Sequence, residues 1–147
     1  MSEEQKNRLV QIAKSLIGKP YKYGAKTEEA PEFFDCSSFT QYVFKQIGIE
    51  IPRSTIFQAD YGEPVQDINQ LETGDLLFLH GTQGFYNQRF PIGIGHVILY
   101  IGNGKTFHAA SRRVQEKPEV IEIGEVEEKD LNEVVEKLKP LIVIKRL

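Results

Sequence analysis

The first fifty residues carry hydrophobic side chains at helical spacing in two segments. One segment ends before Gly18 and Pro20, which are typical helix stop signals, and its apolar stripe is Leu9, Ile12, Ala13, Leu16 and Ile17. The other begins at or just after Asp35 and ends before Gly48; its stripe is Phe39, Tyr42, Val43 and Ile47. The pattern therefore predicts two helices, and it places Cys36 in the first turn of the second.

Beyond Pro52 the pattern changes to short apolar runs separated by Gly, Asn and Asp, which is typical of strands. The runs are DLLFL at 75–79, HVILYIG at 96–102, KTFHAAS at 105–111 and EVIEI at 119–123. The GNG sequence at 102–104 is a tight hairpin signal between the middle two. A short amphipathic helix is expected between Asp130 and Pro140, and LIVIKRL closes the chain as a final strand. Helices followed by hairpin strands predict an α+β fold with an antiparallel sheet.

Composition narrows the class of protein. The chain has 147 residues, 40% of them hydrophobic, which suits a single domain over residues 1–147. The net charge of −3 comes from interleaved acidic and basic residues, so we expect no nucleic-acid partner. The sequence has no secretory h-region and no apolar run of membrane-spanning length, so as it stands it is typical of a cytoplasmic protein. A protein whose signal peptide has been removed, or one delivered to a cell wall by an export machine, would show the same sequence pattern. The pattern does not determine the oligomeric state.

Cys36 is the only cysteine, and a lone cysteine is most often a buried small hydrophobic residue. Its neighbours favour a different interpretation. The start of a helix presents unpaired amides and the positive end of the helix dipole, which favour thiolate over thiol and could hold an oxyanion. Asp35 and Ser37 on either side are polar, so we expect this turn to face a cleft, although Asp35 could also serve only as a helix cap.

Two of the three histidines, His96 and His108, fall in the two strands that flank the GNG turn. A catalytic thiol needs a base, and the base needs an orienting partner, so this hairpin could supply both. A two-residue loop would pair Leu99 with His108 and put the two rings on opposite faces of the sheet. A three-residue connection or a bulge would shift the pairing by one and put both rings on one face. The alternative is that each histidine is an ordinary half-buried strand residue.

Five blocks resemble the NlpC/p60 family of bacterial cell-wall cysteine peptidases, which have a papain-like fold with N-terminal helices packed on a central antiparallel sheet. They run in the family's order and cover about residues 8–111. They are PYKYGA at 20–25, FDCSSF at 34–39, GIEIPRST at 48–55 with Gln58, ETGDLLFL at 72–79 and GHVILYIGNGKTFHAAS at 95–111.

The resemblance implies roles for individual residues. Cys36 matches the nucleophile, His96 the general base and His108 the third catalytic residue, which orients the His96 ring. Tyr21 matches the side chain that points its hydroxyl into the oxyanion region, unless it is an ordinary core residue. The remaining assignments are to substrate binding: Asp35 and Ser37 match positions that line the acyl-side subsites, and Arg53 is expected near the cleft, where a surface role is the alternative.

The activity that the resemblance implies is hydrolysis of an amide bond in a peptidoglycan stem peptide, most often between γ-D-glutamyl and a diamino acid, through a thioester. An acyltransferase or amidase that uses the same thioester is one alternative, and a non-catalytic peptide-binding module is another. We expect no cofactor and no metal, because the two hairpin histidines lack the helical i, i+4 spacing of a hydrolase zinc motif. The long stretch 81–95, with Phe85, Tyr86, Arg89 and Phe90, could be a specificity lid or an ordinary surface loop.

Overall fold

A computed structural model describes residues 1–81 and 88–147. Within them six strands form one antiparallel sheet in the order β1-β6-β2-β3-β4-β5. The strands are β1 (Glu63–Pro64), β2 (Leu76–Leu79), β3 (His96–Gly102), β4 (Lys105–Gln115), β5 (Ile121–Asp130) and β6 (Leu141–Arg146). The helices are α1 (Glu3–Ser15), α2 (Cys36–Gln46), α3 (Thr55–Gln58) and α4 (Leu131–Leu138), with short 3-10 turns at Thr27–Glu29 and Ile68–Gln70. The predicted α+β class with an antiparallel sheet is confirmed.

The two N-terminal helices begin at side chains that cap them. Ser2 forms a capping box with Gln5 at the start of α1. Asp35 does the same at the start of α2, where its carboxylate accepts a hydrogen bond from the Ser38 amide at 2.8 Å. Gly48, with a φ of 84°, follows α2 in the left-handed conformation that glycine tolerates best. Both predicted helices are thus confirmed, and Cys36 is the first residue of α2.

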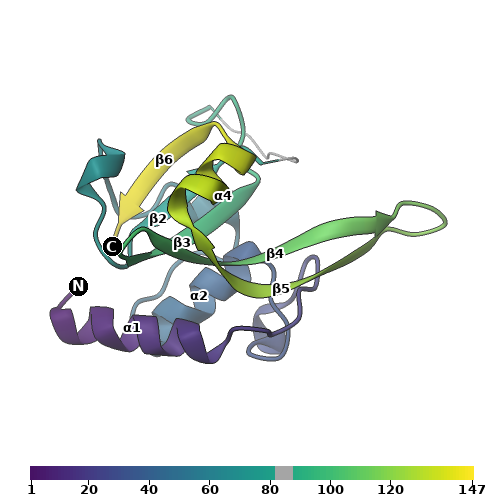
Figure 1. Cartoon of the computed structure of the whole chain (residues 1–147), viewed down its shortest axis with the longest axis horizontal. Coiled ribbons are helices and arrows are strands. Elements are labelled where there is room, and N and C mark those ends of the chain that lie inside the picture. Colours follow the sequence, from purple (N-terminus) through teal and green to yellow (C-terminus); the bar gives the residue numbers. More distant parts are fainter. Residues whose placement is uncertain (82–87) are drawn as a thin grey trace.

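Helices cover both faces of the sheet (Figure 1). Residues of α1 and α2 pack on one face, in a cluster that includes Leu9, Val43 and Phe78. On the other face α4 contributes Val134 to a smaller cluster with Leu77. Successive residues of β2 therefore alternate between two buried faces, which is why its sequence is a continuous apolar run and all four of its residues are buried.

Strands β4 and β5 form a two-stranded arm that projects beyond the rest of the molecule (Figure 1). The predicted bounds of these strands, 105–111 and 119–123, were wrong. The pairing runs from Lys105↔Asp130 to Gln115↔Ile121, so β5 extends seven residues past Ile123. Most of the added positions are charged, and only Val126 among residues 124–130 is buried, so hydrophobic patterning gave no signal for them. Cross-strand hydrogen bonds form there regardless of side-chain polarity.

The stretch 81–95 is described only in part. Phe85 and Tyr86, expected as parts of a lid, lie outside the described residues. Arg89 forms an ion pair with Asp60 at 3.0 Å. Phe90 packs against the hydrophobic cluster on the face of the sheet that α1 and α2 cover. Neither residue is among the described residues that line the cavity containing Cys36. The described contacts of these two side chains are thus with the body of the domain, and a lid role for the stretch 81–95 stays a prediction.

Candidate active site

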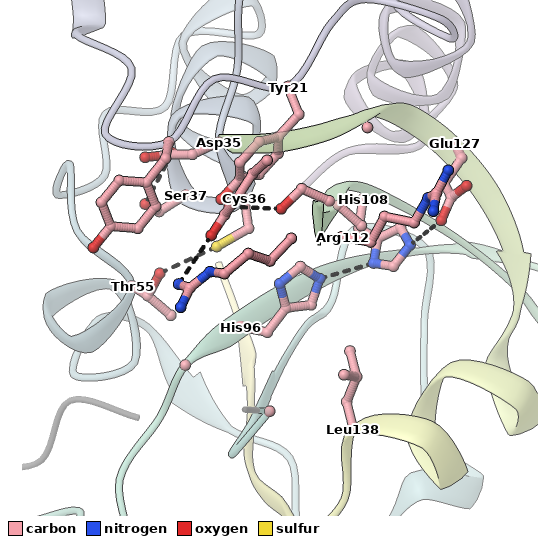
Figure 2. Close-up of a pocket in the computed structure, with 18 of the residues that line it drawn as sticks. Tyr21, Asp35, Cys36, Ser37, Thr55, His96, His108, Arg112, Glu127 and Leu138 are labelled. Carbon is pink, nitrogen blue, oxygen red and sulfur yellow. Dashed lines mark hydrogen bonds and ion pairs between the residues drawn. The ribbon is translucent and has the colours of Figure 1, made fainter. Parts of the chain in front are cut away.

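A cavity of about 1260 Å³ lies where the start of α2 meets β3, the β4–β5 arm and the end of α4 (Figure 2). All seven residues that the sequence suggested for a site line it: Tyr21, Asp35, Cys36, Ser37, Arg53, His96 and His108. They come from segments spread over about ninety residues of the chain, so the fold has brought together what the sequence holds apart.

Cys36 is partly buried at the N-terminus of α2, with its sulfur beside the sheet. Its side-chain partner among the described residues is Thr55, whose Oγ1 lies 3.5 Å from the sulfur. The backbone amides of Val97 and Ser37 also donate hydrogen bonds to the sulfur. Val97 follows His96 in β3, so the sulfur lies against the strand that carries this histidine. The thiol faces the cavity and is not enclosed in hydrocarbon.

The protonation of Cys36 differs from the expectation drawn from the helix start. Burial raises the pKa of the thiol, and the nearby Asp35 carboxylate raises it further. The Thr55 hydroxyl and the amides of Val97 and Ser37 lower it by a smaller amount. Burial is the largest contribution, so the helix start does not by itself produce a thiolate. Cys36 is a neutral thiol in the absence of substrate and needs a base to remove its proton.

The two hairpin histidines lie on the same face of the sheet. Leu99 pairs with Phe107, and the register shifts between Tyr100 and Gly102 at a bulge before the turn. Gly102 pairs with Lys105 across a two-residue loop, and the bulge then shifts the pairing by one. The bulge alternative is therefore confirmed, and the unbulged register that would have paired Leu99 with His108 is excluded. Asn103 takes a φ of 54°, between two glycines that also have positive φ, which is the backbone conformation this bulged turn requires.

His96 and His108 form a direct hydrogen bond (Figure 2). The Nε2 atom of His96 lies 2.8 Å from Nδ1 of His108, and the ring planes are nearly perpendicular at 79°. Burial lowers the pKa of His96 to about 4 and is also the main reason that the pKa of His108 falls to about 3. Both rings are therefore neutral at physiological pH, so His96 can accept a proton.

Glu127 is a site residue that the sequence analysis missed. Its Oε1 atom lies 3.0 Å from Nε2 of His108, on the side of the ring away from His96 (Figure 2). The contact exists because His108 and Glu127 are paired across β4 and β5. The predicted strand ended at Ile123 and so gave Glu127 no cross-strand partner. A periodicity of polar residues facing β4 across a longer hairpin is the signal that could have identified it.

Tyr21 lies across the cavity from the histidines and next to Cys36 (Figure 2). Its hydroxyl is hydrogen-bonded to Ser111. Burial is the main reason that the pKa of this phenol is raised well above its ordinary value, and the neighbouring Cys36 adds to the effect. The hydroxyl is thus a neutral group that can donate a hydrogen bond within the cavity.

Asp35, Ser37 and Arg53 form one hydrogen-bonded cluster beside Cys36. Arg53 donates from Nη2 to Asp35 Oδ2 at 2.7 Å and from Nη1 to Ser37 Oγ at 2.8 Å, and it also contacts the carbonyl oxygen of Ala25. Ser37 is only 4% exposed. These polar groups are therefore largely occupied by one another, and the cluster holds the first turn of α2 against the loop that carries Arg53.

No group of three or more His, Cys, Asp or Glu side chains within 1–81 and 88–147 is arranged to hold a metal ion. In the same part of the chain, no helix combines the length and apolar character that crossing a bilayer requires.

Comparison with known proteins places the chain in a family. Residues 18–134 match the profile of the NlpC/P60 family. The chain is 38% identical over 103 residues to the gamma-DL-glutamyl hydrolase of Bacillus subtilis, an alignment that covers 69% of this chain and 22% of that protein. It is 35% identical over 102 residues to the probable endopeptidase p60 of Listeria grayi, covering 69% of this chain and 17% of that one.

The fold agrees with a solved structure of the same family. The NlpC/p60 domain of the peptidoglycan hydrolase SagA superposes with a TM-score of 0.67 and 26% identity, and the match covers 97% of this chain and 98% of that one. The chain thus spans less than a quarter of the length of the two curated relatives but nearly all of this isolated domain. The matched profile, together with a helix-start cysteine and a histidine hairpin lining one cavity, shows that the chain belongs to the NlpC/P60 family.

Proposed function

We propose that the chain is a cysteine peptidase that hydrolyses an amide bond in peptidoglycan stem peptides, with Cys36 as nucleophile and His96 as general base. The observation that carries the proposal is the placement of the Cys36 thiol in one cavity with a neutral, hydrogen-bonded histidine pair. The names of the relatives support the substrate class, since one is a gamma-DL-glutamyl hydrolase and another a peptidoglycan hydrolase. The γ-D-glutamyl bond to a diamino acid is the bond that we propose.

The first half of the reaction forms an acyl-enzyme. His96 takes the thiol proton on Nδ1, because its Nε2 is already bonded to His108. As this proton leaves, the sulfur attacks the amide carbonyl carbon, and the carbonyl oxygen becomes an oxyanion. The amide at the start of α2 and the Tyr21 hydroxyl stabilise this charge. When the C–N bond breaks, His96 returns its proton to the leaving amine.

The second half releases the acid product. Water enters the site, His96 removes one of its protons, and the resulting hydroxide attacks the thioester carbonyl. The C–S bond breaks, the proton on His96 returns to the sulfur, and the enzyme is regenerated with a free carboxylic acid as product. Each half therefore uses the same nitrogen of His96 once as base and once as acid.

In the structure the sulfur is hydrogen-bonded to Thr55, and His96 is hydrogen-bonded to His108. Catalytic hydrogen bonds are commonly loose in ligand-free enzymes and tighten in the substrate complex. The pKa directions favour the same picture, since both the thiol and the imidazole are neutral before substrate binds. We therefore propose that proton transfer from Cys36 to His96 accompanies attack on the substrate.

Digestion of purified muropeptides, with the products identified by mass spectrometry, tests the proposal. We expect the stem peptide to be cut after the γ-D-glutamyl residue, and Cys36→Ala to give no product. Adding an amine acceptor shows whether the acyl group passes to water or to the amine. Intact muropeptides after incubation with the folded wild-type chain would contradict the peptidase assignment and favour a peptide-binding module.

A further inference from the structure

The hydrogen-bonded chain in the cavity does not end at the second histidine. From the structure we infer that Glu127 is a positioning residue, which fixes the hydrogen positions on His108 and, through it, on His96. The inference rests on the proposed function for its kinetic consequence, although its structural part stands on geometry alone. That geometry is a continuous path from Glu127 Oε1 to His108 Nε2 at 3.0 Å, and from His108 Nδ1 to His96 Nε2 at 2.8 Å.

The carboxylate decides which nitrogen of His108 carries the hydrogen. A carboxylate at neutral pH can only accept hydrogen bonds, and a neutral imidazole has one N–H group. The bond to Glu127 therefore requires the hydrogen of His108 to be on Nε2. The other tautomer would place a ring lone pair against the carboxylate oxygen inside a site where His108 is only 4% exposed, and an unpaired polar contact of this kind is costly when buried.

The choice made at His108 is passed on to His96. With its hydrogen on Nε2, the ring of His108 presents a lone pair at Nδ1, so this atom must accept from His96 Nε2–H. The hydrogen of His96 is then on Nε2 and its Nδ1 carries the free lone pair. In the opposite arrangement Nδ1 of His96 would be protonated and unable to take the proton of Cys36. Glu127 thus selects, through two successive hydrogen bonds, the tautomer of His96 that can act as a base.

The charge of Glu127 matters once the reaction begins. When His96 accepts the thiol proton it becomes an imidazolium, and this cation lies at the end of a hydrogen-bonded path to an anion. The hydrogens on the two Nε2 atoms stay in place throughout, so no proton moves to Glu127. The carboxylate acts as the orienting aspartate does in a serine peptidase triad, holding a tautomer and stabilising the imidazolium.

Other charged groups act on the histidine pair, but those named here are not hydrogen-bonded to it as Glu127 is. Lys129 and Lys137 both lower the pKa of His108, and Asp35 raises that of His96. Asp35, however, is engaged by Arg53 and by the Ser38 amide. Among the described residues, Glu127 is the carboxylate that is hydrogen-bonded to the histidine pair.

Imidazole ¹⁵N chemical shifts test the inference without any substrate. In the wild-type protein we expect His108 and His96 both to be in the Nε2–H form, with Nδ1 of His96 unprotonated. Glu127→Ala should produce a mixture of tautomers at both rings. Glu128→Ala is the matched control, because Glu128 is the next residue of β5, is exposed and does not line the cavity. An Nδ1–H form of His108 in the wild type, or unchanged tautomers in Glu127→Ala, would overturn the inference.

Kinetics on the stem peptide give the second measurement. We expect Glu127→Ala to lower kcat by about 10- to 100-fold with little change in KM, by analogy with the carboxylates that orient metal-binding imidazoles from the far side. Glu127→Gln, which keeps an accepting oxygen but loses the charge, should fall between Glu127→Ala and the wild type. Glu127 is 36% exposed, so both variants should keep the fold, and a thermal melt checks this.

The two measurements separate the two claims. An active wild type whose kcat is unchanged by Glu127→Ala would overturn the role of Glu127 and leave the peptidase assignment intact. An inactive wild type would contradict the peptidase assignment, while the ¹⁵N shifts would still decide whether Glu127 sets the tautomers. A kcat loss that Glu128→Ala reproduces would show a general effect of charge on the arm and would also overturn the inference.

Discussion

The two walls of the cavity are built in different ways. The cysteine wall, which consists of Asp35, Cys36 and Ser37 with Arg53, is organised by a helix cap within three residues and one arginine that reaches across to it. The histidine wall, which consists of His96, His108 and Glu127, depends on the register of three strands. A local interaction can thus place Cys36, the proposed nucleophile, whereas His96, His108 and Glu127 meet only if β3, β4 and β5 pair as they do.

His96→Ala should have the largest effect of the variants that probe the two walls, because it removes the proposed general base. We expect turnover of the stem peptide to fall by about 10²- to 10⁴-fold, the usual contribution of a positioned general base. His80→Ala is the matched control, since the His80 ring bonds the Gly93 carbonyl oxygen and does not line the cavity. Equal losses in the two variants would mean that His96 acts through the fold and not as the base.

Acid should lower the free energy of unfolding through the two histidines of the histidine wall. The folded pKa of His96, about 4, and of His108, about 3, lie below the value of about 6.5 for an unfolded histidine. The unfolded chain therefore binds more protons between these limits, so the free energy of unfolding is highest above pH 6.5 and falls as the pH drops toward 3. Each unit of pKa difference corresponds to about 1.4 kcal/mol.

Urea unfolding at a series of pH values measures this loss. His108→Gln removes one of the two titrations, so its unfolding free energy should depend less steeply on pH than that of the wild type between pH 3 and 6.5. Parallel curves for the two proteins would contradict the assignment of this acid sensitivity to His108.

Arg53→Lys should weaken the cysteine wall by an intermediate amount. Lysine keeps the charge but cannot donate from two nitrogens to Asp35 and Ser37 at once. We expect a loss of about 1.5–3 kcal/mol in the free energy of unfolding, the range for a hydrogen bond to a charged group, together with reduced turnover. Arg8→Lys on the exposed side of α1 is the control and should change stability by about 0.5 kcal/mol or less. An unchanged stability in Arg53→Lys would show that the cap alone holds Cys36.

Thr55→Val should have the smallest effect. The change keeps the shape of a buried side chain but removes the hydroxyl that lies 3.5 Å from the sulfur and lowers its pKa. The midpoint of the pH dependence of iodoacetamide labelling should therefore shift upward, and turnover should fall by a few-fold at most. A downward shift would mean that the hydroxyl stabilises the neutral thiol and not the thiolate.

Several features of the cysteine wall could be predicted from the sequence. The start of α2 at or just after Asp35 and its end before Gly48 were correct, and the cap at Asp35 that the sequence left as one possibility is present, because helix ends are specified by side chains within a few positions of the end. The position of both histidines in one hairpin was also correct, since GNG is a local turn signal. The sequence left the register of that hairpin open between two alternatives.

Tertiary structure decided the rest. The bulge between Tyr100 and Gly102 put both rings on one face, and the long pairing of β4 with β5 brought Glu127 to His108. Burial then kept both histidines neutral and outweighed the helix start at Cys36, so that the thiol needs a base. Local sequence signals were enough to identify the residues that could react, because capping and turn formation are local. Register, burial and long-range hydrogen bonds depend on segments far apart in the chain, so only the folded structure could determine which tautomer and which charge each group carries.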